Sequence, residues 1–287
     1  MSFSTDVKEE LSKISNLANK KCVKLEFLGY SKSNNVSIVE NNLRFSTESE
    51  YNINRFGKLL NNLNCNDYNI ELQGKSYVIT SKNKEVISLM QEDIKEIQME
   101  NDIEDRAFVR GCFLGSGSIN NPENKYHMEI IFKYQEDATF VLKILEKYNI
   151  YFKLLEKKTS YSIYSKDGEE ISKFLAFIGA NSAVLKFEDI RVYRDMRNNV
   201  NRLVNCETAN LTKTVGAAVK QIEAIKLIKE KGKFESLTES LKEMAELRLK
   251  YPESSLAELG KMADPPIGKS GVNHRLKAIV EIAEELK

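Results

Sequence analysis

The sequence is organised around Val109-Arg110-Gly111-Cys112-Phe113-Leu114-Gly115-Ser116-Gly117-Ser118-Ile119, near the middle of the chain. The first part of this stretch predicts a helix, on which Gly111 and Gly115 share one face because they are four residues apart. Glycine in a helix interior destabilises the helix by about 1 kcal/mol relative to alanine. Two glycines on one face therefore indicate that another backbone approaches closely. Gly115-Ser116-Gly117 then ends the helix, and an extended segment begins at Ser118. The alternative is an ordinary core helix that contains glycine.

Length and composition indicate a globular protein of two or three domains. The chain has 287 residues, of which 41% are hydrophobic and 30% charged, and its net charge is +1. No apolar run approaches the ~20 residues of a membrane span, and the first residues lack the pattern of a signal peptide. We therefore expect a cytoplasmic protein with no membrane partner.

The cysteines and histidines predict neither disulfides nor a metal site. No two cysteines form a C-x-x-C pair, and neither histidine has a neighbour at metal-ligand spacing. The residues concerned are Cys22, Cys65, Cys112, Cys206, His127 and His274. We expect reduced cysteines, no metal and no cofactor.

The first 182 residues predict the order αββαββα twice. Residues 77–82 (YVITSK) match residues 161–166 (YSIYSK) at an offset of 84, and this register places Gly29 near Gly111 and Gly115. The acidic stretch 92–105 is expected to join the halves as a solvated helix. The first half has helices at 6–17, 22–30, 50–63 and 83–91 and strands at 36–40, 42–47, 68–72 and 76–81. The second half has helices at 106–115, 136–148 and 167–178 and strands at 118–119, 128–134, 151–156 and 160–165.

Beyond residue 182 the sequence predicts only helices. Residues 188–204 and 209–230 have helical periodicity, with a turn at 205–208 in which Thr208 is a plausible N-cap. A third helix is expected over 236–251. Residues 191–233 contain ten basic and four acidic residues, a net charge of +6 that suits phosphate contacts. Arg197 and Arg202 are candidates for such contacts, and a solvated helix face is the alternative.

The last stretch predicts a short helix, a tight turn and a longer helix. Ser255 and Glu258 have the spacing of a capping box, and Pro265-Pro266 forces a turn. Ser270 is the expected N-cap of the final helix, whose apolar stripe leaves the opposite side free. This arrangement is typical of a helix-turn-helix, and an ordinary helical hairpin is the alternative. The candidate DNA-binding residues here are Ser254, Ser255, Lys269, Ser270, Asn273, His274, Arg275 and Lys277.

The glycine-containing helix resembles the LAGLIDADG motif of homing endonucleases. In that family two such helices pack side by side between pseudo-symmetric halves, and the last acidic residue of each binds the metal that cleaves DNA. Here Leu114 and Ser116 stand where the motif has its two Asp residues, and residues 31–35 after the first helix also lack a carboxylate. The resemblance implies a nuclease-derived domain without catalytic residues.

The whole chain resembles the WhiA family of bacterial regulators, which is associated with sporulation, cell division and chromosome segregation. The resemblance depends on the degenerate motif, on residues 201–211 (NRLVNCETANL) and on residues 265–276 (PPIGKSGVNHRL). It implies a helix-turn-helix that binds double-stranded DNA, no enzymatic activity and a nucleoid-associated location. A second regulatory protein is a possible partner of the LAGLIDADG-like domain.

These observations predict an α+β fold followed by an all-α domain. The LAGLIDADG-like domain is expected over 1–182, with halves at about 1–92 and 100–182, and the DNA-binding domain over 186–287, with its helix-turn-helix at about 254–287. The first functional hypothesis is a regulator that binds DNA without cutting it, involved in division, segregation or sporulation-related transcription. The alternatives are a protein-interaction scaffold with weak DNA binding and an active LAGLIDADG endonuclease, which would need carboxylates at the motif-helix ends.

Overall fold

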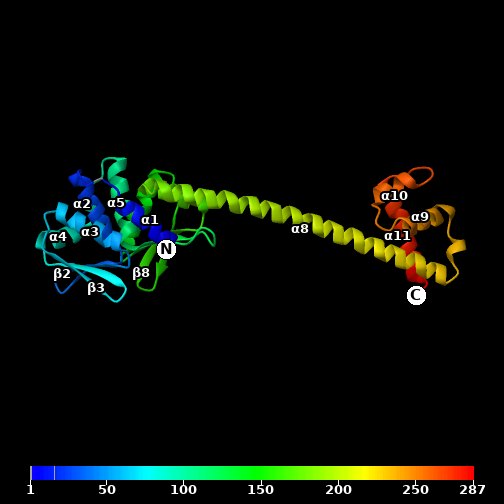
Figure 1. The fold of residues 1–287 in the computed structure, drawn as a ribbon, viewed down its shortest axis with the longest axis horizontal. Coiled ribbons are helices and arrows are strands. Elements are labelled where there is room, and N and C mark those ends of the chain that lie inside the picture. The colour runs from blue at the N-terminus through cyan, green and yellow to red at the C-terminus, as the bar shows by residue number, and fades with distance from the viewer. Residues whose placement is uncertain (1, 16) are drawn as a thin grey trace. The chain divides into compact units, whose positions relative to one another are not determined.

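The chain forms two compact units in the computed structural model, which describes residues 2–15 and 17–287. The units are Met1–Asp195 and Met196–Lys287. The boundary between them falls inside helix α8 (Asn181–Glu230), which contributes residues to both (Figure 1). Each unit has its own core, so each is described separately.

The first half of unit one is a helix-covered, four-stranded antiparallel sheet with the strand order β1-β2-β4-β3. Serine and asparagine N-caps begin all four helices, where each accepts a hydrogen bond from a free backbone amide. The elements are α1 (Phe3–Ser12), α2 (Lys20–Lys32), β1 (Val36–Val39), β2 (Asn42–Thr47), α3 (Glu50–Asn62), β3 (Tyr68–Gln73), β4 (Ser76–Ser81) and α4 (Lys84–Met90).

The second half repeats this plan, with the strand order β5-β6-β8-β7. Equivalent elements start at nearly constant offsets: α3 at Glu50 and α6 at Gln135, β4 at Ser76 and β8 at Ser160. The predicted αββαββα repeat is therefore confirmed. The elements are η1 (Ile94–Glu96), α5 (Asp102–Ser116), β5 (Gly117–Ile119), β6 (Met128–Phe132), α6 (Gln135–Lys147), β7 (Lys153–Lys157), β8 (Ser160–Ser165) and α7 (Gly168–Ile178).

The two halves meet where the motif helices α2 and α5 cross. A Cβ atom on Gly29 would overlap the carbonyl oxygen of Phe108, and one on Gly111 would overlap that of Glu26. These reciprocal contacts relate the two helices at an offset of 82, which is the signature of a local two-fold axis. The close backbone approach predicted from Gly111 is confirmed, and it explains why glycine stands there despite its cost to a helix.

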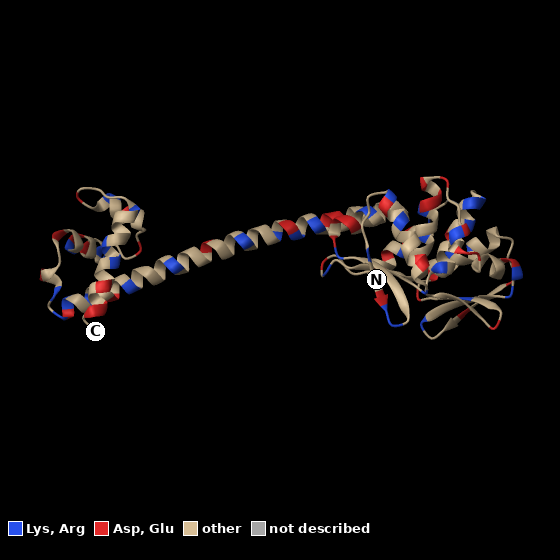
Figure 2. Ribbon diagram, turned by 180° about the vertical axis from the view of Figure 1, so that it is seen from behind, with Lys and Arg blue, Asp and Glu red and all other residues tan. Residues whose placement is uncertain are grey.

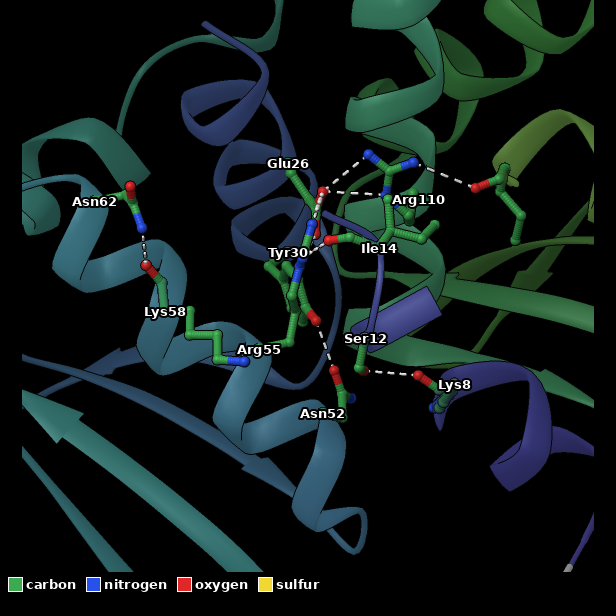
Figure 3. Close-up of polar contacts among 11 residues, drawn as sticks. Lys8, Ser12, Ile14, Glu26, Tyr30, Asn52, Arg55, Lys58, Asn62 and Arg110 are labelled. Carbon is green, nitrogen blue, oxygen red and sulfur yellow. Dashed lines mark hydrogen bonds and ion pairs between the residues drawn. The ribbon is translucent and has the colours of Figure 1, made fainter. Parts of the chain in front are cut away.

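A buried ionic cluster lies at this crossing. The Glu26 carboxylate accepts from Arg55 Nε at 2.8 Å and from Arg110 Nε at 3.0 Å (Figure 3). Each guanidinium also donates to a backbone oxygen, Arg55 to Ile14 and Arg110 to Ile178. Glu26 is fully buried, so the two arginines stabilise its charge where water cannot. The carboxylate on α2 thus joins the two halves through Arg55 and Arg110, and the same arginines bind the backbone at Ile14 and Ile178.

The second unit is entirely helical among the residues described. Besides the end of α8 it contains η2 (Phe234–Ser236), α9 (Glu239–Lys250), α10 (Leu256–Met262) and α11 (Lys269–Glu285). Its core is an apolar cluster of residues from all four α-helices. Members include Ile225, Ile228, Met244, Leu259, Val272, Leu276 and Ile279, all of which are fully buried.

Four sequence-based expectations about elements were wrong. Residues 205–208 form no turn, because α8 is helical without interruption and the Thr208 carbonyl accepts from the Thr212 hydroxyl. The 92–105 linker contains only the short η1 before α5 begins, since Ile94 and Ile97 pack into the core. The N-terminal helix spans Phe3–Ser12 rather than 6–17; residue 16 lies outside the described residues. The N-cap of α11 is Gly268, not Ser270.

Candidate nucleic-acid interface

Helix α10 is positioned by the predicted capping box. The Glu258 amide donates to Ser255 Oγ at 3.3 Å, and the Ser255 amide donates to the Glu258 carboxylate at 2.7 Å. The hydrogen bond from the Ser255 backbone amide lowers the pKa of the Glu258 carboxyl below its usual value of 4.5. The capping box is confirmed, and the Ser255 hydroxyl is engaged as the N-cap of α10.

The connection from α10 to α11 is tight. Gly260 lies under it: a Cβ atom there would overlap the Ile267 carbonyl oxygen, and the Ile267 amide donates to the Gly260 carbonyl at 2.9 Å. The connection contains Pro265 after a cis peptide bond. The hydrogen bond between Ile267 and Gly260 holds the start of α11 against α10, as a helix-turn-helix requires.

Helix α11 buries one side and leaves the other open. Val272, Leu276, Ile279 and Ala283 are buried in the core of unit two. Asn273 and His274, in the N-terminal half, are exposed, and their side chains have no hydrogen-bond or ion-pair partner within residues 2–15 and 17–287. Polar side chains in the first turns of a recognition helix can reach base edges in the major groove.

The other candidates on this motif differ in how free they are. Lys269 and Ser270 are exposed in the first turn of α11. Lys277 is exposed and lies 3.5 Å from Glu281, a weak solvent-exposed pair. Arg275 instead donates to the Glu243 carboxylate of α9 at 3.2 Å, and Ser254 accepts from Arg248 through its carbonyl at 2.8 Å. These two residues hold the fold of unit two.

The basic stretch of α8 is divided between packing and solvent. Arg191 pairs with Glu188 at 3.0 Å, and the Arg194 guanidinium lies 4.4 Å from the centre of the Tyr126 ring. Arg197 and Arg202 are exposed and make no hydrogen bond or ion pair to any residue that the structure describes. Figure 2 shows basic residues recurring along this helix. The guanidinium groups of Arg197 and Arg202 are therefore available to phosphates.

At the end of motif helix α5, Leu114 and Ser116 stand where the nuclease motif has carboxylates, and two asparagine amides bind the same helix end. Leu114 is fully buried, and the Ser116 hydroxyl donates to the Ile131 carbonyl and accepts from the Ile131 amide at 3.2 Å. Asn52 donates its amide to the Leu114 carbonyl at 2.7 Å, and Asn35 donates to Gly115 at 3.0 Å. Among the described residues, no group of three or more His, Cys, Asp or Glu is placed to hold a metal ion.

Several of these contacts have no signal in the amino-acid sequence. Asn52, Asn35 and Glu26 each contact a partner from a distant segment, and isolated polar residues in a sequence do not show their partners. A helix long and apolar enough to cross a membrane is not found in the part of the chain that the structure describes.

The fold and the two sites define a class of protein: a LAGLIDADG-like domain joined to a helix-turn-helix domain. The family model described as the WhiA LAGLIDADG-like domain matches residues 105–197, and that of the WhiA C-terminal HTH domain matches residues 200–283. The chain belongs to the WhiA family.

Individual relatives cover most or all of the chain. A protein from Clostridium novyi named "Probable cell division protein WhiA" is 40% identical over all of this chain and 99% of its own length. The protein of the same name from Clostridium acetobutylicum is 48% identical over 72% of this chain, a match that spans 65% of that relative. The crystal structure of full-length WhiA from Thermotoga maritima matches with a TM-score of 0.62 and 31% identity over 99% of both chains.

Proposed function

We propose that this protein is a DNA-binding regulator of bacterial cell division that does not cleave DNA. The observation that carries the proposal is the free N-terminal half of α11, where Asn273 and His274 face solvent beside a tightly held turn. Arg197 and Arg202 supply phosphate contacts in this proposal, which includes a nucleoid-associated location in the cytoplasm. Chromosome segregation, sporulation-related transcription or both are the processes it would serve.

Loss of cleavage follows from the chemistry at the motif-helix ends. A LAGLIDADG nuclease needs carboxylates there to bind divalent metal, and Leu114 and Ser116 offer none. Incubation of the protein with bound DNA and Mg²⁺ or Mn²⁺ should leave the duplex intact. Metal-dependent double-strand cleavage that disappears when an acidic residue of the chain is replaced would contradict this part of the proposal.

Base recognition by α11 is tested by side-chain removal. Asn273→Ala and His274→Ala should each weaken binding at the specific site by roughly 1–3 kcal/mol and change binding to random DNA little. The measurement is the affinity for specific and random duplexes at one salt concentration. Glu281→Gln is the matched control on the same helix, further from its N-terminus, and should do far less. If both alanine variants fold and the ratio of specific to random affinity stays unchanged, α11 does not read the bases.

A second candidate function is protein binding through unit one. In the strand register, the side chains directed away from the helices include Arg44, Lys153 and Lys157 but also Glu71 and Glu129. Lys157 and Glu129 pair at 2.8 Å, so the net positive charge of these strands is small. A nearly neutral face suits a protein partner better than a phosphate backbone.

Charge reversal on these strands separates the two candidates. Arg44→Glu combined with Lys153→Glu should leave the affinity of the full chain for DNA unchanged if the sheets meet a protein. A several-fold loss of DNA affinity would assign the sheets to the DNA interface instead.

A further inference from the structure

We propose that the cavity between the start of α1 and the β2–α3 connection binds the phosphate group of a small hydroxylated molecule, such as a sugar phosphate or a nucleotide. The cavity measures about 560 Å³, a volume within the range of small-molecule sites. It lies within unit one and does not depend on the DNA-binding proposal.

Lys8 is the residue that indicates an anionic ligand. Its side chain lines the cavity, and its ammonium makes neither a hydrogen bond nor an ion pair with any residue in the described parts of the chain. The nearest aromatic contact is the Phe113 ring, whose centre lies 6.0 Å away. Lys8 is half-buried, and desolvation of its amine lowers its pKa from 10.5 to about 8. A partly desolvated ammonium without a counter-ion is stabilised when an anion binds beside it.

Two helix N-termini face the same space. Ser2 and Ser49, the N-caps of α1 and α3, both line the cavity. The amide groups in the first turn of a helix and its dipole favour a phosphate at that end. These helices have 10 and 13 residues, long enough for a full dipole effect at their first turns. Lys8 and the two helix ends therefore contribute positive potential to one cavity, against the carboxylates of Glu48 in its wall and of Asp6 and Glu50 in the first turns of the two helices.

The remaining wall is polar and suits a hydroxylated ligand. Hydroxyl groups come from Ser4 and Thr5 on α1 and from Ser46 and Thr47 at the end of β2. Glu48 also lines the cavity but forms no ion pair with Lys8, and its carboxylate can accept hydrogen bonds from ligand hydroxyls. Hydroxyls and one carboxylate are the groups that recognise a sugar next to its phosphate.

The cavity also reaches the end of motif helix α5. Asn35 lines it and donates its amide to the Gly115 carbonyl of α5 at 3.0 Å. A ligand that contacts Asn35 would therefore contact a side chain that holds the end of a motif helix. A bound ligand would therefore act on the position of α5, which packs between the two halves.

The test is a calorimetric titration of the full chain with inorganic phosphate, pyrophosphate and AMP at constant ionic strength. We expect saturable binding that weakens by about ten- to hundredfold in Lys8→Met, which removes the charge and keeps the length. Lys8→Arg should retain most of the affinity. Lys13→Met, which alters an exposed lysine on the turn after the same helix, should bind like the parent.

Proton uptake provides an independent readout. Because a bound anion raises the pKa of Lys8 from about 8, binding should take up protons between pH 7.5 and 9, and affinity should fall as the pH rises through that range. The uptake appears as a dependence of the binding enthalpy on the buffer, and it should vanish in Lys8→Met. The ¹³Cε resonance of Lys8 reports the same titration without any variant.

Three results would overturn the proposal. One is the absence of saturable binding of all three probes to the parent protein. Another is equal binding to the parent and to a folded Lys8→Met variant. The third is a Lys8-dependent interaction with duplex DNA alone, which would assign the cavity to the DNA backbone.

Discussion

Glu26 is the residue on which the packing of unit one depends most. Its carboxylate is fully buried and bound by two arginines, so its removal leaves two guanidinium groups without their counter-charge. Breaking a buried ion pair from one side costs about 3–5 kcal/mol. Glu26→Gln should therefore lower the free energy of unfolding of unit one by that order, as measured by urea denaturation. Glu9→Gln, at an exposed pair on α1, is the control and should change it by less than about 1 kcal/mol.

Asp137 gives unit one a pH-dependent stability. Burial raises the pKa of this carboxyl from 3.8 to about 6, against the opposing influence of Lys32 and with added repulsion from Glu136 and Asp93. The folded state therefore holds a proton that the unfolded state has lost, and stability falls as the pH rises from about 4 through 6. The loss amounts to at most about 3 kcal/mol.

Asp137→Asn should remove this dependence. The variant should be more stable than the parent above pH 6.5 and nearly equal to it at pH 4, in urea denaturation across that range. Asn52, which occupies the equivalent position at the start of α3, shows that an amide fits such a site, where it donates to the Leu114 carbonyl. Asn52→Asp is the reciprocal control and should lose stability as the pH rises. Parallel pH profiles for parent and Asp137→Asn would rule the explanation out.

At the scale of elements, the contact between α2 and α5 sets how unit one is built. A methyl group on Gly111 would overlap the Glu26 backbone, which cannot move as a flexible side chain can. Gly111→Ala should therefore destabilise unit one by about 1–3 kcal/mol or more in thermal or urea unfolding. Gly216→Ala in α8, where a Cβ atom meets nothing within 4 Å, is the matched control and should stabilise its helix slightly. Equal effects of the two changes would show that the crossing tolerates a methyl group.

Most elements could be predicted from the sequence because their patterns are local. The paired hairpins and the capping box at Ser255 depend on spacing within a few residues, and both are confirmed. The uninterrupted α8 could not be predicted, because Asn205 to Thr208 contains residues that favour turns, and helix propensity is a weak guide. The cluster around Glu26 was also missed, since its members are 29 and 84 residues apart.

At the scale of the whole molecule, DNA binding should depend on salt through α8 as well as through α11. Arg197 and Arg202 are free of protein partners among the described residues, so each can neutralise a phosphate and release counter-ions. Replacing both with alanine should make the slope of log affinity against log salt shallower by about 2, with similar losses on all sequences. Arg106→Ala, at a half-buried arginine of unit one that pairs with Asp102, is the control. An unchanged slope would show that these guanidinium groups do not contact DNA.

The exposed part of α8 has a consequence for how the chain is degraded. Every residue from 195 to 217 is exposed, so the backbone hydrogen bonds of this stretch lack the cover that side-chain burial gives elsewhere. It also contains Gly216 and several Asn, Thr and Val residues, which are poor helix formers. Segments with few buried contacts open at low free-energy cost, long before the cores on either side unfold. Proteases that require an extended backbone should therefore find their first substrate here, and a single cut would leave two fragments that each keep an intact hydrophobic core.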